Sequence, residues 1–376
     1  MRFKKRLFGC SAILLSTLFS IASCKEASHT YTCGLAEIKG TFDFHTDEQK
    51  AYLSGDYKNV PYEGYEEVSR PKPLRLEWSL LDENSSQGKA QEYTVSLSRD
   101  EGFSSPLTYH TQESFLDVYN LYLGATYYWK VSARFANGSE CLSPVSSFST
   151  ASIGPRNLYV DGVTNCRDLG GWERSDGSHV KQGMLYRTAR LNRSYIKKAK
   201  PEITSRGKEA MLEELGVRSE IDLRKNTSDY PENGGIASSV LGEEVNYYNV
   251  PMDFSDVGVY LKEENEAMKK VFSILSEKSN YPLFFHCHIG TDRTGFIAFL
   301  IDGLLGVSEE DLYRDYLFSN FASIGGSREV ATIEEAYVSY IKSRSGNSLS
   351  EKIRNCLLEV GIPESQLEAI VSIMSE

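Results

Sequence analysis

The sequence predicts an all-β sandwich followed by an α/β domain, in which a mostly parallel sheet is flanked by helices. Two observations carry this prediction. Short runs that alternate apolar and polar residues begin at Pro73, and this period is typical of strands buried on one face. Beyond residue 157, apolar strand-like runs alternate with amphipathic helices, an order that favours a parallel sheet covered by helices. We expect the sandwich over residues 24–152 and the α/β domain over residues 157–376.

Residues 1–23 have the pattern of an export signal. A basic start, MRFKKR, is followed by an uncharged apolar run over residues 7–20, which is short for a membrane span. The run ends in IASC, which resembles the bacterial lipobox. The resemblance implies that Cys24 is lipidated and anchors an exported protein to the bacterial cell envelope, at the periplasmic face or the cell surface. The alternative is a plain secretory signal with an incidental Cys.

Three strands of the sandwich follow directly from alternation. They are LRLEWSL from Leu74, EYTVSLSRD from Glu92 and TYYWKVSARF from Thr126, with turn signals between them. The stretch NLYLGATYYWKVSARFANGSECLSPVSSFST resembles the final strands of a fibronectin type III domain. The resemblance covers about residues 73–150 and implies either a spacer or a binding module, of which we favour the spacer. Cys33 and Cys141 flank this region, so we pair them as a disulfide.

The stretch ASIGPRN, residues 151–157, has the composition of a linker. Beyond it, apolar runs without polar interruption indicate strands, and a period near 3.6 indicates helices. We expect strands within residues 219–225, 245–253 and 281–285. We expect helices within residues 207–217, 264–277, 294–306, 308–320, 333–343 and 348–362.

The stretch PLFFHCHIGTDRTGFIAFL, Pro282 to Leu300, joins a buried strand to a buried helix through a polar loop. Ligands of open α/β sheets bind at the carboxyl ends of strands. The loop amides and the helix N-terminus both favour an anion at that point. The same donors favour thiolate over thiol at Cys287, and such settings lower a cysteine pKa from about 8.5 to roughly 3.5–7.5. The stretch therefore predicts a phosphate cradle with a nucleophile beneath it.

The residue types in this loop suit phosphoryl transfer. Cys287 can attack phosphorus and form a covalent phosphocysteine. The planar fork of Arg293 can hold two phosphoryl oxygens, and Thr294 can donate to the thiolate. No cofactor or metal is required, because Arg293 and the loop amides neutralise the charge. The residues expected to contact the phosphoryl group are His288, Ile289, Gly290, Thr291, Thr294 and Gly295.

Residues 286–295, HCHIGTDRTG, resemble the signature of the protein tyrosine phosphatase superfamily, a Cys and an Arg separated by five residues. Their Asp-Arg-Thr-Gly ending is similar to a bacterial branch that contains tyrosine and phosphoinositide phosphatases. Residues 165–191 and 220–235 resemble the opening motif and the Asp-Leu-Arg strand end of that branch. The resemblance implies a Cys-dependent phosphomonoester hydrolase of the protein tyrosine or dual-specificity type. These motifs also imply a set of supporting residues, namely Arg167, Asp168, Asp222 and Arg224.

Two positions depart from the pattern of the branch. Thr291 stands where the loop usually has a Lys, so a positive charge that would favour multiply phosphorylated head groups is missing. Cys166 stands where the opening motif usually has an aromatic residue, and we interpret it as a core residue rather than a second thiol of the site.

A carboxyl group must protonate the leaving oxygen and later accept a proton from water. Asp292 in the loop is the first candidate and Asp253, at a strand end, is the second. Asp222 is a third candidate, but its pairing with Arg224 in a salt bridge is an equal alternative. His286 precedes the nucleophile on a strand and points away from it, so we expect it to fix the loop backbone rather than act as a base.

Other classes of function fit less well. The consecutive His286, Cys287 and His288 cannot easily share one zinc ion, because adjacent strand residues face opposite sides. A phosphate-binding module without catalysis remains an alternative. The net charge of -11 argues against a nucleic-acid partner. We expect phosphotyrosine in a protein or peptide as the substrate, with a phosphoinositide or inositol phosphate as the second choice.

Overall fold

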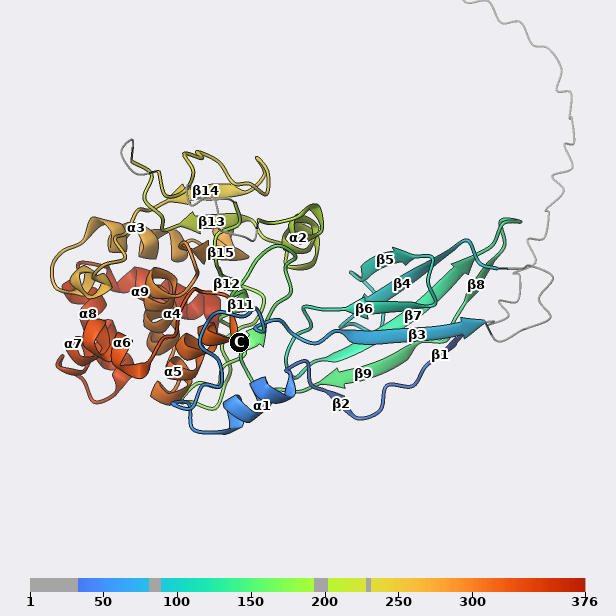
Figure 1. Cartoon of the computed structure of the whole chain (residues 1–376), viewed down its shortest axis with the longest axis horizontal. Coiled ribbons are helices and arrows are strands. Elements are labelled where there is room, and N and C mark those ends of the chain that lie inside the picture. Colours follow the sequence, from blue (N-terminus) through green and yellow to red (C-terminus); the bar gives the residue numbers. More distant parts are fainter. Residues whose placement is uncertain (1–32, 81–88, 193–201, 228–230, 376) are drawn as a thin grey trace, which may run out of the picture.

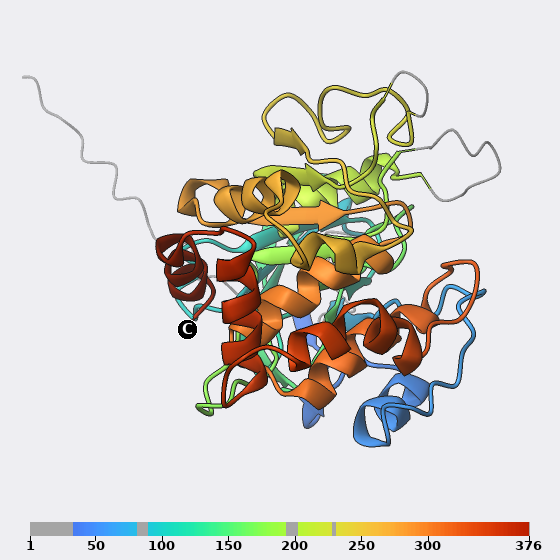
Figure 2. The same ribbon diagram turned by 90° about the vertical axis from the view of Figure 1, so that its left-hand side faces the viewer.

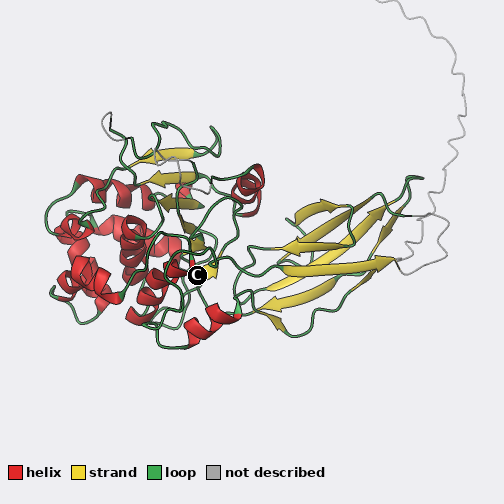
Figure 3. Ribbon diagram, in the orientation of Figure 1, coloured by secondary structure: helices red, strands yellow, loops and turns green. Residues whose placement is uncertain are grey.

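The computed structural model describes residues 33–80, 89–192, 202–227 and 231–375, which form two lobes side by side (Figure 1). One lobe consists of strands, and the described helices lie in or against the other lobe (Figure 3). Within these ranges, no helix combines the length and the apolar character that crossing a membrane would need. The predicted signal segment and Cys24 lie outside the described residues.

The first lobe is a sandwich of two sheets. Within both sheets the strand pairs of the described residues are antiparallel, except that β2 (Thr41–Phe42) runs parallel to β9 (Ser146–Thr150). The first sheet has the order β1 (Cys33–Leu35), β3 (Leu74–Leu80) and β6 (Phe115–Val118). The second has the order β2 (Thr41–Phe42), β9 (Ser146–Thr150), β7 (Thr126–Arg134), β4 (Glu92–Ser98) and β5 (Leu107–Thr111), with β8 (Glu140–Leu142) on β7.

The core of the sandwich contains the residues that alternation marks. On β3, β4 and β7 every second side chain is buried, as the period of two requires. Trp78 and Trp129 both lie in this core, so neither is exposed to a ligand. Cys33 and Cys141 are also buried there, and their pairing stays a prediction.

The second lobe is built on a mixed sheet of six strands. Strands β12, β15, β13 and β14 are parallel, as predicted, whereas two short strands extend the sheet antiparallel. Strands β13 and β15 are buried along their whole length, because helices cover both faces. The order is β10 (Arg156–Asn157), β11 (Arg167–Asp168), β12 (Leu185–Thr188), β15 (Leu283–His286), β13 (Ser219–Asp222) and β14 (Asn246–Asn249).

The helices surround this sheet. Helix α3 (Glu266–Leu275) buries five apolar side chains on one face, and α4 (Asp292–Leu304) is buried on nearly all sides, so it forms the centre of the lobe. The helices around them are α2 (Ser205–Glu209), α5 (Glu309–Phe318), α6 (Val330–Ile333), α7 (Ser339–Lys342), α8 (Leu349–Glu359) and α9 (Glu364–Met374). Two π-helical turns are η1 (Ala210–Glu214) and η5 (Glu334–Val338). The 3-10 helical turns are η2 (Val257–Leu261), η3 (Lys278–Asn280) and η4 (Ser319–Phe321).

An N-terminal segment, residues 47–70, packs on the α/β lobe, although the predicted sandwich includes it. The segment begins with α1 (Asp47–Ser54), which lies beside the orange and red helices in Figure 2. Tyr52 belongs to the core of the α/β lobe, and Tyr57 stacks on Tyr313 with ring centroids 5.3 Å apart. The α/β lobe is therefore built from two separate parts of the chain.

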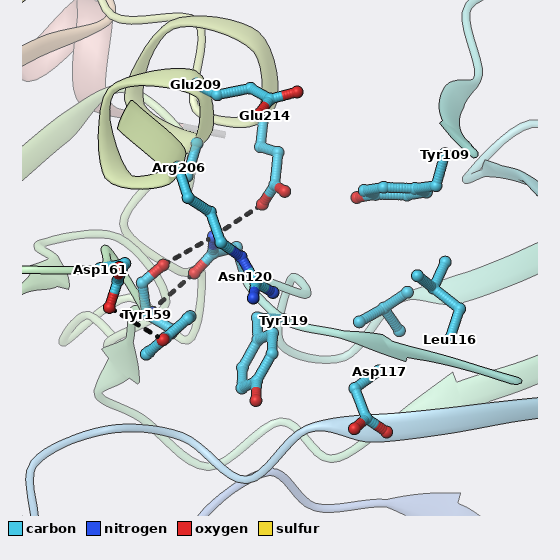
Figure 4. A pocket seen from close by; sticks show the side chains of 12 residues that line it. Tyr109, Leu116, Asp117, Tyr119, Asn120, Tyr159, Asp161, Arg206, Glu209 and Glu214 are labelled. Atoms are coloured by element: carbon cyan, nitrogen blue, oxygen red, sulfur yellow. Dashed lines mark hydrogen bonds between the residues drawn. The ribbon is translucent and has the colours of Figure 1, made fainter. Parts of the chain in front are cut away.

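The two lobes meet at a polar junction. Arg156 is buried there and pairs with Asp168 at 2.7 Å, while its other nitrogens donate to the carbonyl oxygens of Asn120 and Leu121. A small pocket of about 130 Å³ lies beside it (Figure 4). In that view the side-chain amide of Asn120 donates a hydrogen bond to the carboxylate of Glu214. Because no residue of Pro282–Leu300 lines this pocket, it is separate from the predicted catalytic loop.

Candidate active site

The loop between β15 and α4 is held from outside through its carbonyl groups. Each of four successive carbonyl oxygens accepts a hydrogen bond from a side chain of the surrounding protein. The pairs are Cys287 with His286 Nδ1 (3.0 Å), His288 with Arg190 (3.1 Å), Ile289 with Asn165 (3.0 Å) and Gly290 with Arg187 (2.8 Å). Three of the four donors come from the stretch 165–191, which explains why that stretch accompanies the loop.

This arrangement turns the loop amides inward. In a trans peptide the N–H lies opposite the C=O, so the amides of residues 288–291 face away from the four donors. Within the described ranges, none of these amides donates a hydrogen bond to the protein. The loop ends at the N-terminus of α4, where the helix dipole also favours negative charge. The loop can therefore hold a tetrahedral oxyanion.

Gly290 permits the tight path of the loop. Its φ is +71°, a left-handed conformation that glycine adopts without strain. A Cβ atom at this position would lie 2.5 Å from the carbonyl oxygen of Thr188, at the end of β12. The glycine is thus required by the neighbouring strand rather than by close approach to an anion.

Cys287 lies at the base of this loop and is 1% exposed. Burial disfavours the thiolate, but the charge of Arg293 and the nearby hydroxyl and amide of Thr294 outweigh it and hold the pKa of Cys287 below its ordinary value. The predicted lowering of the thiol pKa therefore comes from residues of the same loop and helix. Cys166, in contrast, lies in an apolar cluster where burial raises its pKa to about 12, so it belongs to the core as expected.

Arg293 is aimed by a carboxylate that sequence reasoning missed. Glu232 holds both terminal nitrogens of Arg293, at 2.9 and 2.5 Å, and is itself buried. The Nε of Arg293 has no partner among the described residues, which leaves it available to a ligand. Glu232 falls within the stretch that resembles the Asp-Leu-Arg strand end, and that is the one signal that could have pointed to it.

His286 fixes the start of the loop, as its position on β15 predicts. Its Nε2 lies 2.9 Å from Glu220, and its Nδ1 donates to the carbonyl oxygen of Cys287. Burial opposes protonation, but the nearby Asp222 and Glu220 outweigh it and raise the pKa of His286. The possible metal-ligand atoms of Glu220, Asp222 and His286 lie within 4.8 Å of one another. Asp222, however, is already bound to Arg224.

The three aspartates considered as proton donors occupy different settings. Asp222 is fully buried and forms a two-point salt bridge with Arg224, which favours a structural role. Asp253 lies 2.5 Å from Lys225, which holds the pKa of Asp253 well below its usual range. Asp292 pairs with Arg328 at 2.8 Å, remains partly exposed and lines an open cavity beside the loop.

The supporting residues of the opening motif lie behind the loop. Arg167 donates to Asp315 and to Asn165, and Asn165 in turn holds the loop carbonyl of Ile289. Asp168 accepts hydrogen bonds from the amides of residues 170 and 183 and pairs with Arg156. These residues therefore brace the catalytic loop and the lobe junction without reaching the anion site.

Some predicted contacts to the phosphoryl group differ in the structure. The amide of Gly295 donates to Thr291 within the first turn of α4, so it is not available to a substrate. The side chain of Thr291 is buried and accepts from Asn165, which leaves only its backbone facing the anion site. Burial and the charge of Arg190 lower the pKa of His288 to about 4, so its ring is neutral near pH 7.

Comparison with known proteins agrees with this geometry. The family model of the tyrosine phosphatase family matches residues 158–360, which is more than half of the chain. The chain belongs to the tyrosine phosphatase family. It is therefore a phosphatase, and a Cupriavidus necator protein named as a tyrosine-protein phosphatase is 27% identical to it over 216 residues, covering 50% of this chain and 73% of the relative.

Two solved structures are more distant. The core catalytic domain of the PP-IP phosphatase SIW14 from S. cerevisiae is 19% identical, with a TM-score of 0.28, and the match covers 45% of this chain and 90% of that one. A fibronectin type III domain from the human KIAA0970 protein is 20% identical, with a TM-score of 0.20, and the match covers 29% of this chain and 84% of that one. At these scores nothing about the substrate follows from either.

Proposed function

We propose that this phosphatase hydrolyses phosphomonoesters through a phosphocysteine at Cys287. The observation that carries the proposal is the combination of a buried thiol of lowered pKa with inward-facing loop amides and a braced arginine. A thiolate in that position can attack phosphorus while the amides and Arg293 stabilise the three equatorial oxygens.

The reaction has two steps. In the first, the sulfur of Cys287 attacks phosphorus, the bond to the leaving oxygen breaks, and a carboxyl group protonates that oxygen. In the second, the same group, now a carboxylate, takes a proton from water. The water oxygen attacks phosphorus and the S–P bond breaks, so the thiolate and inorganic phosphate are released. Arg293 remains charged throughout and holds the phosphoryl oxygens in both steps.

We assign the acid role to Asp292 rather than to Asp253. Asp292 is the first residue of α4 and lines the cavity into which a leaving group would extend. Asp253 is paired with Lys225, which lowers its pKa, and it does not line this cavity. Its role is better explained as an ion pair that holds the adjoining loop.

For the substrate we favour phosphotyrosine in a protein or peptide, and a phosphoinositide or inositol phosphate is the alternative. The IASC stretch supports lipid anchoring at Cys24 to the bacterial cell envelope, at the periplasmic face or the cell surface. The sandwich would then be a fibronectin type III-like spacer between membrane and catalytic lobe. The polar junction at Arg156 supports this role, because it joins the two lobes firmly.

The test is phosphate release by the full chain, purified in detergent with reductant and EDTA present. The panel contains phosphotyrosine and phosphoserine peptides, phosphoinositides and inositol hexakisphosphate, and Cys287→Ser is assayed beside the wild type. We expect turnover that survives EDTA and is lost in the variant. Turnover by Cys287→Ser contradicts the proposed nucleophile. No turnover by folded and reduced wild type on any substrate contradicts the proposal and favours a phosphate-binding module.

A further inference from the structure

A cavity of about 420 Å³ lies beside the catalytic loop, on the side of Asp292. Its walls come from the loop that follows Met252, from the start of α4 and from the helical region around η5. The lining residues are Phe254, Ser255, Asp256, Val257, Lys262, Asp292, Tyr316, Thr332, Ile333, Glu335, Ala336 and Tyr337. None of residues 288–291, whose amides face the oxyanion site, lines this cavity, so the cavity is a neighbouring space.

The charge of this cavity is negative. Three carboxylates line it, and Lys262 is the one cation among the described lining residues. Asp292 is paired with Arg328, but neither Asp256 nor Glu335 forms an ion pair with another described residue. Both are exposed at the rim. A second phosphate group would be repelled here, whereas a cationic group would be attracted.

The floor of the cavity provides an independent observation. Tyr337 is 1% exposed, and its hydroxyl has no hydrogen-bond partner among the described residues. The edges of Phe296 and Phe299 hold its ring in place. Burial raises the pKa of Tyr337 well above its ordinary value, so the hydroxyl stays neutral and can accept a hydrogen bond. Such an unpartnered group needs an explanation, and a bound donor supplies one.

The backbone at this point is also unusual. Glu335 and Tyr337 lie on η5, a single π-helical turn between α6 and α7. Such turns occur frequently at functional sites, because the extra residue re-aims the side chains of a helix. Gly258 on η2 packs directly against it, since a Cβ there would lie 1.8 Å from the carbonyl oxygen of Ala336. The backbones of η2 and η5 are therefore closely packed at this wall.

An aromatic side chain connects the cavity to the catalytic centre. Phe254 is 57% exposed, although it is a large apolar residue, and its ring lies 5.8 Å from the guanidinium of Arg293. An exposed ring at the edge of a phosphate site can pack against an aryl leaving group. A substrate held by the loop would thus pass Phe254 before it reaches the acidic cavity.

We propose that this cavity receives the basic side chain of a lysine or arginine next to the phosphotyrosine of a peptide substrate. Asp256 and Glu335 attract the cation at the rim, and the hydroxyl of Tyr337 accepts one of its hydrogens on the floor. The inference rests on the proposed function, because it specifies which phosphopeptides the same catalytic loop would prefer.

The test compares two phosphotyrosine peptides that differ only in an Arg or a Glu beside the phosphotyrosine. We expect the wild type to prefer the Arg peptide in kcat/KM, by about two- to fivefold for each rim carboxylate. The double variant Asp256→Asn, Glu335→Gln removes that preference, and added salt weakens it. Tyr337→Phe removes the hydroxyl but keeps the ring, and it lowers the preference for the Arg peptide. Glu243→Gln, an exposed carboxylate remote from the cavity, keeps it.

Three outcomes overturn the inference alone. One is equal turnover of both peptides by wild type that still hydrolyses p-nitrophenyl phosphate, and another is a preference that the double variant retains in full. The third is faster turnover of inositol hexakisphosphate than of either peptide, since the acidic cavity should repel it. Failure of the wild type on all of these esters overturns the proposed function as well.

Discussion

The buried pair of Glu232 and Arg293 offers a sharp test of how the site is held. Glu232→Gln preserves the shape of the side chain but removes its charge. Arg293 then keeps only neutral acceptors, namely the new amide oxygen and the carbonyl oxygens of Leu223 and Met252. Two consequences follow, one for turnover and one for the pKa of Cys287.

The first consequence concerns turnover. A hydrogen bond to a charged group contributes about 1.5–3 kcal/mol. If one such contribution is lost from the transition state, kcat falls about 10- to 150-fold, since about 1.36 kcal/mol corresponds to a factor of ten. The second consequence concerns the thiol. The charge of Arg293 lowers the pKa of Cys287, so removing the opposing carboxylate should lower that pKa further.

The assay follows kcat with p-nitrophenyl phosphate and the pKa of Cys287 from the pH dependence of inactivation by iodoacetate. Circular dichroism and thermal melting establish that the variant is folded, and Glu243→Gln is the matched control. We expect lower kcat together with a lower thiol pKa. A kcat equal to that of wild type, or a thiol pKa that rises, refutes the view that Glu232 aims Arg293.

Other predictions concern the loop and the domain boundary. Gly290→Ala should abolish phosphate release or destabilise the protein, because a left-handed conformation costs a non-glycine residue roughly 1–2 kcal/mol in addition to the clash; normal melting and turnover would contradict this. The rate at which iodoacetate inactivates wild type should rise with pH and level off below about 8.5, since the thiolate forms above its lowered pKa; a plateau above that value contradicts it. Asp292→Asn should lower kcat by about 10²- to 10⁴-fold for a poor leaving group and less for p-nitrophenol; equal losses on both esters argue against an acid role. Residues 157–376 alone should melt at lower temperature than the full chain and should bind a peptide of residues 47–70; equal melting temperatures contradict this.

Much of the fold follows from local pattern. The buried face of α3 is the set of five apolar residues that a period of 3.6 selects, namely Met268, Val271, Phe272, Ile274 and Leu275. The sandwich strand beginning at Leu74 has the bounds that alternation marks. In both cases a single face determines burial, so the sequence pattern contains the necessary information.

The catalytic loop was also predictable, because its parts are contiguous. Strand, loop and helix supply the thiol, the amides and Arg293 within one short stretch. Glu232 was not found, since it meets Arg293 across 61 residues and nothing local marks a loop carboxylate as its partner. The choice between Asp292 and Asp253 likewise depended on Lys225 and on the cavity, which are tertiary features.

The N-terminal segment was assigned to the wrong lobe for a similar reason. One of its partners on α5 lies 262 residues away, in the hydrogen bond from the Tyr52 hydroxyl to the carbonyl oxygen of Arg314. Its tyrosines alternate with polar residues at no regular period, so neither a strand nor a helix stood out. The π-helical turns η1 and η5 were also not predicted, because their sequences are those of ordinary helices.

The most direct test of the central claim is to find the covalent intermediate. The enzyme is mixed with a phosphotyrosine peptide, quenched in acid within the first turnover, digested and mapped by mass spectrometry. The account predicts a phosphoryl group on the peptide that contains Cys287, and none in the presence of excess vanadate. Turnover with no phosphorylated peptide at any quench time, or a phosphoryl group on another residue, would contradict the assignment of Cys287 as the nucleophile.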